Sequence, residues 1–359
     1  MTSEVYFPEH RHLLPLTTIR RSRMLPDTVS GDVEVQRGLR ISLLDVVARG
    51  ISPAPYKLLD AMSFFGLRQS KDLESILRVS EGDEVEIDQV LAEKGRKKMT
   101  SPVFGRVAYF WHGQIVLQAY ADQVELQAGL NGTVIDVRIG RGAVIEGYGA
   151  VLQGVWGNNR NTIGILRIEP SNGLESVYND ALDTEFRGAI IVTRRPLREY
   201  TLQMIQSQGL VGVIAPSIAP SLREAALATS AAILLIEGFG DIRMSTAAMQ
   251  FFESVDGRQA ALDAVTPALL DARRPEVLIN VPFDPNNRPS TPNLNVVLQV
   301  GLTVRLARGE SAGAMGRIIN LPKTPVLMDN GLRVQCAQVE LATGEKIIAP
   351  LANLEVSGA

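Results

Sequence analysis

The chain has little of the chemistry that catalysis and metal binding usually require. Its 359 residues include one cysteine, Cys336, and three histidines. A single thiol excludes an internal disulfide framework and a multi-thiolate metal site, and the alternating run 334–338 predicts that this thiol is buried in a strand. The three histidines lie in the expected N-terminal tail and in a turn, so we propose no Ser-His-Asp or Cys-His set. We therefore predict no catalytic residues and a protein that is not an enzyme.

Long apolar runs are also missing. The longest run, centred on residues 231–236, is too short to span a bilayer, and residues 1–23 lack the apolar core of a signal peptide. We expect a cytoplasmic protein with no membrane insertion. The net charge of −3 gives no global basic field that would attract nucleic acid.

Signatures of bound metals and nucleotides are equally scarce. His10 and His12 lie in an N-terminal segment that we expect to be solvated, and an i, i+2 pair of this kind is more often plain surface than a metal site. No G-x-x-x-x-G-K-[ST] motif occurs, and Gly188 precedes its predicted strand instead of following it. We predict neither a metal nor a cofactor.

Glycine and proline are abundant, at 31 and 19 residues. Between residues 31 and 169, glycines repeatedly introduce short alternating runs, a pattern typical of strands joined by tight turns. A helix over 54–65, closed by Gly66, is expected to interrupt the series. The six clearest strand runs are Gly31–Val35, Gly82–Val85, Gly105–Val107, Gly113–Val116, Gly132–Val134 and Gly142–Ile145.

The stretch 79–107 resembles the biotinyl and lipoyl carrier domains, which have the barrel-sandwich hybrid fold. Its two half-motifs are Gly82-Asp83-Glu84-Val85, leading to Val90-Leu91-Ala92, and Ser101-Pro102-Val103-Phe104-Gly105-Arg106-Val107. Those carriers modify a lysine inside a Met-Lys-Met-like signature. Here Lys97 and Lys98 stand in a cationic turn at a different spacing, so the resemblance implies the fold without its prosthetic group.

Residues 175–260 show a different pattern, in which short apolar runs alternate with segments whose apolar residues have helical spacing. Strands are predicted at 188–193, 211–215 and 232–236, and helices at 197–208, 221–228 and 245–254. This alternation is typical of a small parallel α/β domain.

The carboxyl ends of parallel strands meet at one edge of a sheet, where open sheets bind ligands. Polar side chains follow all three predicted strands, so a site for an anionic or polar ligand is one interpretation of this edge. The other is that any such sheet ends in polar loops. The candidate ligand-binding residues are Arg194, Arg195, Ser217, Glu237 and Asp241.

Trp156 and Arg160 lie in a glycine-rich stretch. A tryptophan between glycines is expected to cap the end of a barrel or, alternatively, to form a contact with a partner protein, since Trp and Arg are enriched in such contacts. Both interpretations stay open at this point.

The C-terminal stretch resembles the KOW motif of ribosomal proteins and NusG transcription factors, which lies in an SH3-like barrel. The matching residues are Gly301-Leu302-Thr303-Val304-Arg305-Leu306 and Gly313-Ala314-Met315-Gly316-Arg317-Ile318. The resemblance implies nucleic-acid or protein binding, and nearby acidic residues offset the basic ones. The candidate phosphate contacts are Arg305, Arg308, Arg317, Lys323 and Arg333.

The sequence thus predicts a multidomain, β-rich α+β protein. The expected parts are an N-terminal tail at 1–24, a barrel-sandwich-hybrid-like domain with a helical insertion at 25–170, the α/β domain at 175–260, a proline-rich linker at 262–295 and an SH3-like barrel at 296–359. The favoured function is a non-catalytic assembly or adaptor protein that binds a protein partner or itself. A KOW-type factor binding nucleic acid, a ribosome or a polymerase through its C-terminal barrel is the alternative, and an enzyme or carrier is the third.

Overall fold

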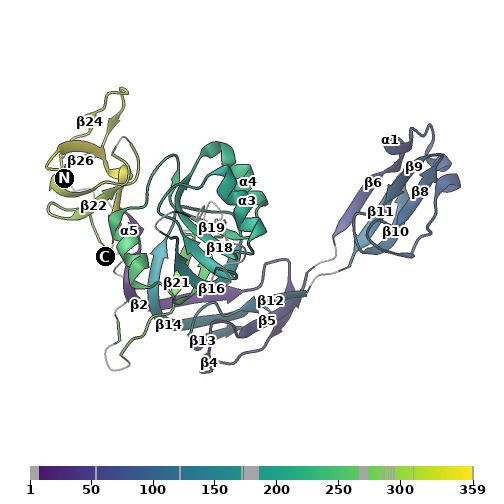
Figure 1. The fold of residues 1–359 in the computed structure, drawn as a ribbon, viewed down its shortest axis with the longest axis horizontal. Coiled ribbons are helices and arrows are strands. Elements are labelled where there is room, and N and C mark those ends of the chain that lie inside the picture. Colours follow the sequence, from purple (N-terminus) through teal and green to yellow (C-terminus); the bar gives the residue numbers. More distant parts are fainter. Residues whose placement is uncertain are drawn as a thin grey trace.

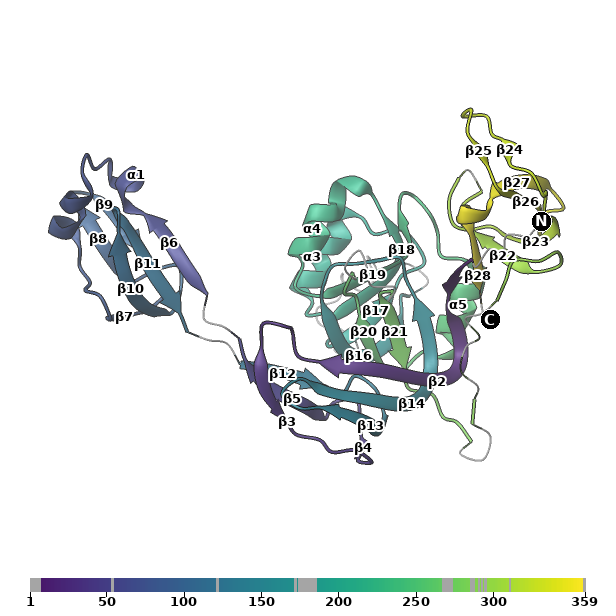
Figure 2. The same ribbon diagram turned by 180° about the vertical axis from the view of Figure 1, so that it is seen from behind.

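The protein is β-rich and contains several separate sheets and few helices. A computed structural model describes residues 8–52, 55–120, 123–170, 173, 186–266, 274–284, 288–289, 291, 293, 296–309 and 311–357. Each of the six glycine-led runs predicted as strands overlaps a strand of the structure. Figures 1 and 2 show three lobes, with the largest sheet in the middle.

The middle lobe is organised by an eleven-stranded sheet. Its strands, in spatial order, are β15 (Trp156–Gly157), β19 (Ala232–Phe239), β18 (Gly212–Ile218), β17 (Ala189–Val192), β16 (Asn161–Ile168), β20 (Gln259–Asp263), β21 (Glu276–Ile279), β14 (Gly142–Gln153), β13 (Gly132–Arg138) and β4 (Arg40–Ile41), with β2 (Leu13–Met24) also paired to β14. The three apolar runs predicted as parallel strands are β17, β18 and β19, and they pair in parallel with one another and with β16.

Helices cover both faces of the parallel strands. Ile190 and Val192 pack with α5 (Thr246–Ser254) on one face, whereas Ala189 and Ile191 pack with α3 (Glu199–Ser207) and α4 (Arg223–Ala228) on the other. The short helix η2 (Pro220–Leu222) leads into α4. Successive strand residues point to opposite faces, so these near-continuous apolar strands are buried on both sides.

An outer module carries its own core, apart from the middle lobe in both views (Figures 1 and 2). Its four-stranded sheet has the order β6 (Tyr56–Asp60), β11 (Gln114–Ala119), β10 (Gly105–Trp111) and β7 (Glu84–Val85). The hairpin of β8 (Val90–Lys94) and β9 (Lys97–Thr100), with α1 (Ala61–Phe65) and η1 (Ser70–Ile76), completes the module. Every residue of this core lies between Leu59 and Leu117.

The outer module is inserted into a small hairpin. A three-stranded sheet of β12 (Gln123–Gln127), β5 (Val46–Ile51) and β3 (Ser30–Val33) lies at its base. Ile51 and Gln123 are paired residues of β5 and β12, so the chain leaves and re-enters this sheet at adjacent positions.

The third lobe brings the two ends of the described chain together. Its six-stranded sheet has the order β1 (Glu9–Arg11), β28 (Leu354–Ser357), β22 (Thr303–Leu306), β23 (Met315–Asn320), β26 (Cys336–Leu341) and β27 (Lys346–Pro350). A hairpin of β24 (Val326–Leu327) and β25 (Arg333–Val334) and the short helix η3 (Leu351–Asn353) belong to the same lobe. Cys336 is buried in β26, as predicted.

Three segments differ from their expected structure. Residues 8–24, expected in a tail, form β1 and the twelve-residue β2, which pairs along almost the whole of β14. The helix expected over 54–65 is confined to α1, because residues 56–60 pair with β11 instead. Within the expected linker 262–295, residues 276–279 form β21, which pairs on both sides, and the prolines around it lie outside the strand.

The expected boundary between the β domain and the α/β domain falls inside one sheet. β16 precedes this boundary and β17 follows it, yet the two strands pair in parallel from Ile165 to Ile168. The long β14 also belongs to this sheet, through β21. Strands from both expected domains therefore share one hydrogen-bonded layer.

Candidate functional site

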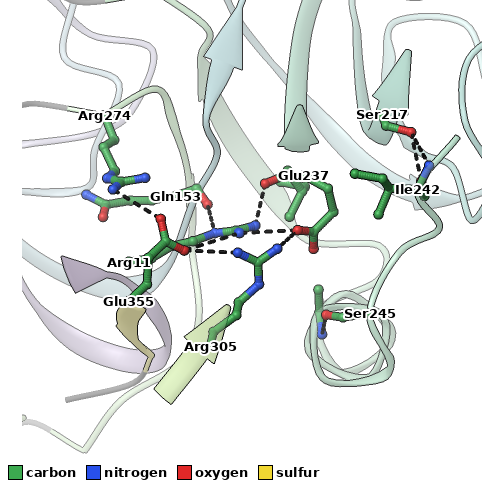
Figure 3. Close-up of polar contacts among 11 residues, drawn as sticks. Arg11, Gln153, Ser217, Glu237, Ile242, Ser245, Arg274, Arg305 and Glu355 are labelled. Atoms are coloured by element: carbon green, nitrogen blue, oxygen red, sulfur yellow. Dashed lines mark hydrogen bonds and ion pairs between the residues drawn. The ribbon is translucent and has the colours of Figure 1, made fainter. Parts of the chain in front are cut away.

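A cluster of buried arginines and glutamates joins the third lobe to the middle lobe (Figure 3). Arg11 is the last residue of β1, Arg305 lies in β22, Glu355 in β28 and Glu237 near the end of β19. Arg305 forms ion pairs with Glu237 and, at 3.0 Å, with Glu355. Arg274 reaches Glu355 at 3.3 Å.

Arg11 is held by the main chain as well as by carboxylates. Its Nε donates to the carbonyl oxygen of Gln153 at 3.2 Å, and its Nη2 donates to that of Ile236 at 2.5 Å. Its Nη1 lies 3.4 Å from Glu237 Oε2. One side chain thereby ties β1 to β14 and β19.

Burial sets the electrostatics of this cluster. The Glu237 side chain is 2% exposed and those of Arg11 and Arg305 are 8% and 10% exposed. Burial, together with a neighbouring arginine, lowers the pKa of Arg11 and of Arg305 to about 10, against the attraction of Glu355. Both arginines stay charged at neutral pH, so they offer fixed positive charge.

The predicted ligand residues do not form one group. Glu237 is turned into the arginine cluster. Ser217 Oγ lies 2.9 Å from the carbonyl oxygen of Gly240 and accepts from Ile242 N at 3.0 Å, so it shapes the loop after β19. Arg195 and Asp241 are exposed.

Arg194 and Glu169 form a separate contact at the end of β16. The backbone N–H of Arg194 donates to Glu169 Oε1 at 2.5 Å, and Arg194 Nη1 donates to the Glu169 carbonyl oxygen at 2.7 Å. Arg194 Nη2 also lies 3.6 Å from the half-exposed Glu253. Burial raises the pKa of Glu169, although the Arg194 N–H and charge oppose the shift.

We expect Glu169→Gln to change how stability depends on pH. A raised folded-state pKa means that the folded protein keeps this proton when the unfolded chain has released it, so stability falls as pH rises through the ordinary pKa toward the raised one. Glutamine keeps the acceptor for Arg194 and removes the charge. Urea unfolding at pH 4.5 and pH 7.5 should show a smaller loss of stability for the variant than for the wild type.

Glu253→Gln is the matched control, because it removes a carboxylate near Arg194 that is half exposed. It should leave the pH dependence unchanged. A Glu169→Gln protein that is less stable than the wild type at pH 7.5 would contradict this explanation.

The candidate phosphate contacts of the third lobe separate into two kinds. Arg305 differs from its expected role, because it is buried and paired with two glutamates. The other four are exposed: Arg308, Arg317, Lys323 and Arg333.

Trp156 and Arg160 lie at the edge of the eleven-stranded sheet. Trp156 is in the edge strand β15, and its ring packs edge-on against Phe239 at 5.4 Å. It also packs against the core under α3 and α4. Arg160 is exposed nearby.

The outer module exposes an apolar sheet face that the sequence analysis did not single out. Cross-strand pairing aligns Tyr109, Val116 and Leu58 in one row of β10, β11 and β6. In this row Val116 is buried, whereas its two neighbours are exposed: Leu58 is 60% exposed and Tyr109 is 47% exposed. Trp111, 59% exposed, lies in the next row of the same face, opposite Gln114.

A sequence signal for this face exists. Residues 108–111 are apolar at every position, whereas a strand with one solvated face usually alternates apolar and polar side chains. Phe110 packs on the module's core, so its neighbours Tyr109 and Trp111 must point the other way.

Metal and membrane features can be assessed for the part of the chain that the structure describes. There, no three His, Cys, Asp or Glu side chains are grouped so that they could hold a metal ion. No helix among these residues has the length and apolar character needed to cross a membrane.

Comparison of the sequence with models of known protein families gives no match, and comparison with curated proteins gives none.

Proposed function

We propose that this chain is a non-catalytic assembly protein whose outer module binds a second copy of the chain. The observation that carries the proposal is the face of β6, β10 and β11 on which Leu58, Tyr109 and Trp111 are exposed, with the buried Val116 between Leu58 and Tyr109. Several large exposed apolar side chains on one face are typical of protein contact sites.

The proposed folds of the lobes agree with this function. We propose that the outer module is a barrel-sandwich hybrid without a carrier lysine: Lys98 lies 3.6 Å from Glu93, and Lys97 Nζ lies 3.3 Å from the Phe64 carbonyl oxygen. We also propose that the third lobe is an SH3-like barrel completed by β1. Both folds serve widely as binding modules.

The strand β6 supports a second copy as the occupant. It lies at the end of its sheet, and among the described residues it pairs with β11 alone, so its other edge offers backbone groups for pairing. Two copies of β6, antiparallel and related by a two-fold axis at Leu58, would place the two Leu58 side chains together. The hydroxyl of each Tyr56 would then lie opposite the Asp60 carboxylate of the other copy, so the strand is complementary to itself.

Light scattering coupled to size-exclusion chromatography tests this proposal. The wild-type chain should elute at twice its mass and dissociate on dilution. Leu58→Glu places two like charges on the axis, so we expect the dimer to weaken at least about tenfold, or about 1.4 kcal/mol.

The control is Leu327→Glu, which alters a leucine on the third lobe that is 59% exposed. It should leave the dimer intact. A wild-type monomer, or a Leu58→Glu protein that dimerises as well as the wild type, would contradict the proposal.

Nucleic-acid binding by the third lobe is the second candidate, favoured by its exposed Arg308, Arg317, Lys323 and Arg333. The absorbance ratio at 260 and 280 nm across the same elution peak tests it. Nucleic acid that co-elutes and is removed by salt would support this function, and a clean peak would count against it.

A further inference from the structure

A cavity of about 530 Å³ lies beside the arginine cluster, between the middle lobe and the third lobe. Its wall takes residues from the start of β2, the ends of β14 and β19, the first turn of α5, and β23. Figure 3 shows Ser245, at the start of α5, nearer to Arg305 and Glu237 than to Arg274 in this view. This volume is in the range of small-molecule sites.

The polar side of the cavity carries positive charge. Arg11 and Arg305 line it against one carboxylate, Glu237. The contacts with Gln153, Ile236 and Glu237 engage three of the five N–H donors of Arg11, and its Nη1 also lies 3.9 Å from Glu355 Oε2. Arg305 uses two of its five toward Glu237 and Glu355, so both guanidinium groups keep donors for a further acceptor.

The first turn of α5 adds to this positive potential. Ser245 caps the helix by accepting from Ala248 N at 3.3 Å. The N–H groups of a first helical turn have no acceptor within the helix, and the helix dipole favours an anion there. Two buried arginines and a helix N-terminus therefore face the same cavity.

The lining also includes apolar side chains. These are Leu13, Leu152, Ile236, Ala248 and Met315. A bare inorganic anion would leave this surface in contact with water, whereas a ligand with an apolar body would cover it.

We propose that this cavity binds a small carboxylate with an apolar body. Its carboxylate lies against Arg11, Arg305 and the first turn of α5, and its apolar part packs on Leu152 and Met315. One more arginine than glutamate lines the cavity, which matches a monoanion better than a phosphate dianion. The site takes residues from two lobes, so the bound ligand also holds the third lobe against the sheet.

Calorimetric titration of the full chain with hexanoate tests the site. We expect saturable binding at least tenfold tighter than that of acetate, which lacks the apolar body. Hexylamine, which carries the opposite charge, should not bind, and inorganic phosphate should bind more weakly than hexanoate. Tighter binding of phosphate, equal binding of hexylamine, or no saturable carboxylate binding would overturn the proposal.

A matched pair of variants at Thr246 separates this site from non-specific binding. Thr246 lines the cavity, is exposed and begins α5. Thr246→Glu keeps the helix favourable, because an acidic residue suits its first turn, but it repels a carboxylate. We expect hexanoate to bind Thr246→Glu at least tenfold more weakly and Thr246→Gln within threefold of the wild type. Equal affinity for the two variants would place the binding elsewhere.

Discussion

Glu237→Gln should destabilise the protein by about 3–5 kcal/mol, the usual cost of removing one partner from a buried ion pair. The substitution leaves Arg11 and Arg305 buried with one carboxylate fewer. Their neighbour Glu355 is already shared with Arg274. The large cost arises because a buried cation loses both its hydration and its partner.

Urea unfolding followed by tryptophan fluorescence measures this effect. A Trp111→Phe background leaves Trp156 as the probe, and Trp156 packs against Phe239, two residues beyond Glu237 in β19. The matched control is Glu146→Gln, which breaks an exposed pair with Arg20 and should cost no more than about 1 kcal/mol. Equal costs for the two variants would mean that water reaches Glu237.

A double variant distinguishes the cost of an unpaired buried charge from the cost of altered packing. Replacing both Arg305 and Glu237 by apolar residues of similar size removes both charges at once. Proteins in which a buried ion pair is replaced in this way often lose little stability. This double variant should therefore be more stable than Glu237→Gln. The opposite order would indicate that hydrogen bonds to the other members of the cluster dominate.

The elements that the sequence predicted well are those with a local signal. Glycine-led runs and apolar runs bounded by helical spacing depend on neighbours a few residues away. The strands β17, β18 and β19 and the helix α5 are of this kind. Such features form wherever the local pattern allows them.

The pairing of segments that lie far apart in the chain left no such local signal in the sequence. β1 pairs with β28 at the other end of the chain, in parallel, from Glu9↔Glu355 to Arg11↔Ser357. Residues 1–24 are rich in Arg and His, so they were predicted to be a tail. Its burial depends on a partner strand that only the folded chain supplies.

The burial of Arg11, Arg305 and Glu237 left no signal in the sequence for the same reason. Arg11 and Arg305 look like surface residues in the sequence, because arginine is seldom buried unless it is paired. Arg305 was therefore predicted to contact phosphate, and Glu237 to contact a ligand. The pairing partners come from β1, β19, β22 and β28, and no spacing in the sequence relates these four strands.

Excision of the outer module should abolish self-association and leave the rest of the fold intact. Ile51 and Gln123 are paired residues, so an Asn-Gly link in place of residues 52–122 would close β5 and β12 as a two-residue hairpin. The core of the outer module lies wholly within the removed segment. The core beneath β3, β5 and β12 keeps all its members, which include Leu25, Val29 and Ala48.

Light scattering and thermal unfolding of the excised chain give the decisive readouts. We expect a monomer whose Tm lies within about 4 °C of that of the full chain, a shift that corresponds to roughly 1 kcal/mol. A dimer of unchanged affinity would locate the interface outside the outer module. A collapse of the Tm would mean that the module supports the sheet, so the contact surface and the scaffold would not be separable. Because its core is self-contained and its two attachment points are adjacent, we expect the first result.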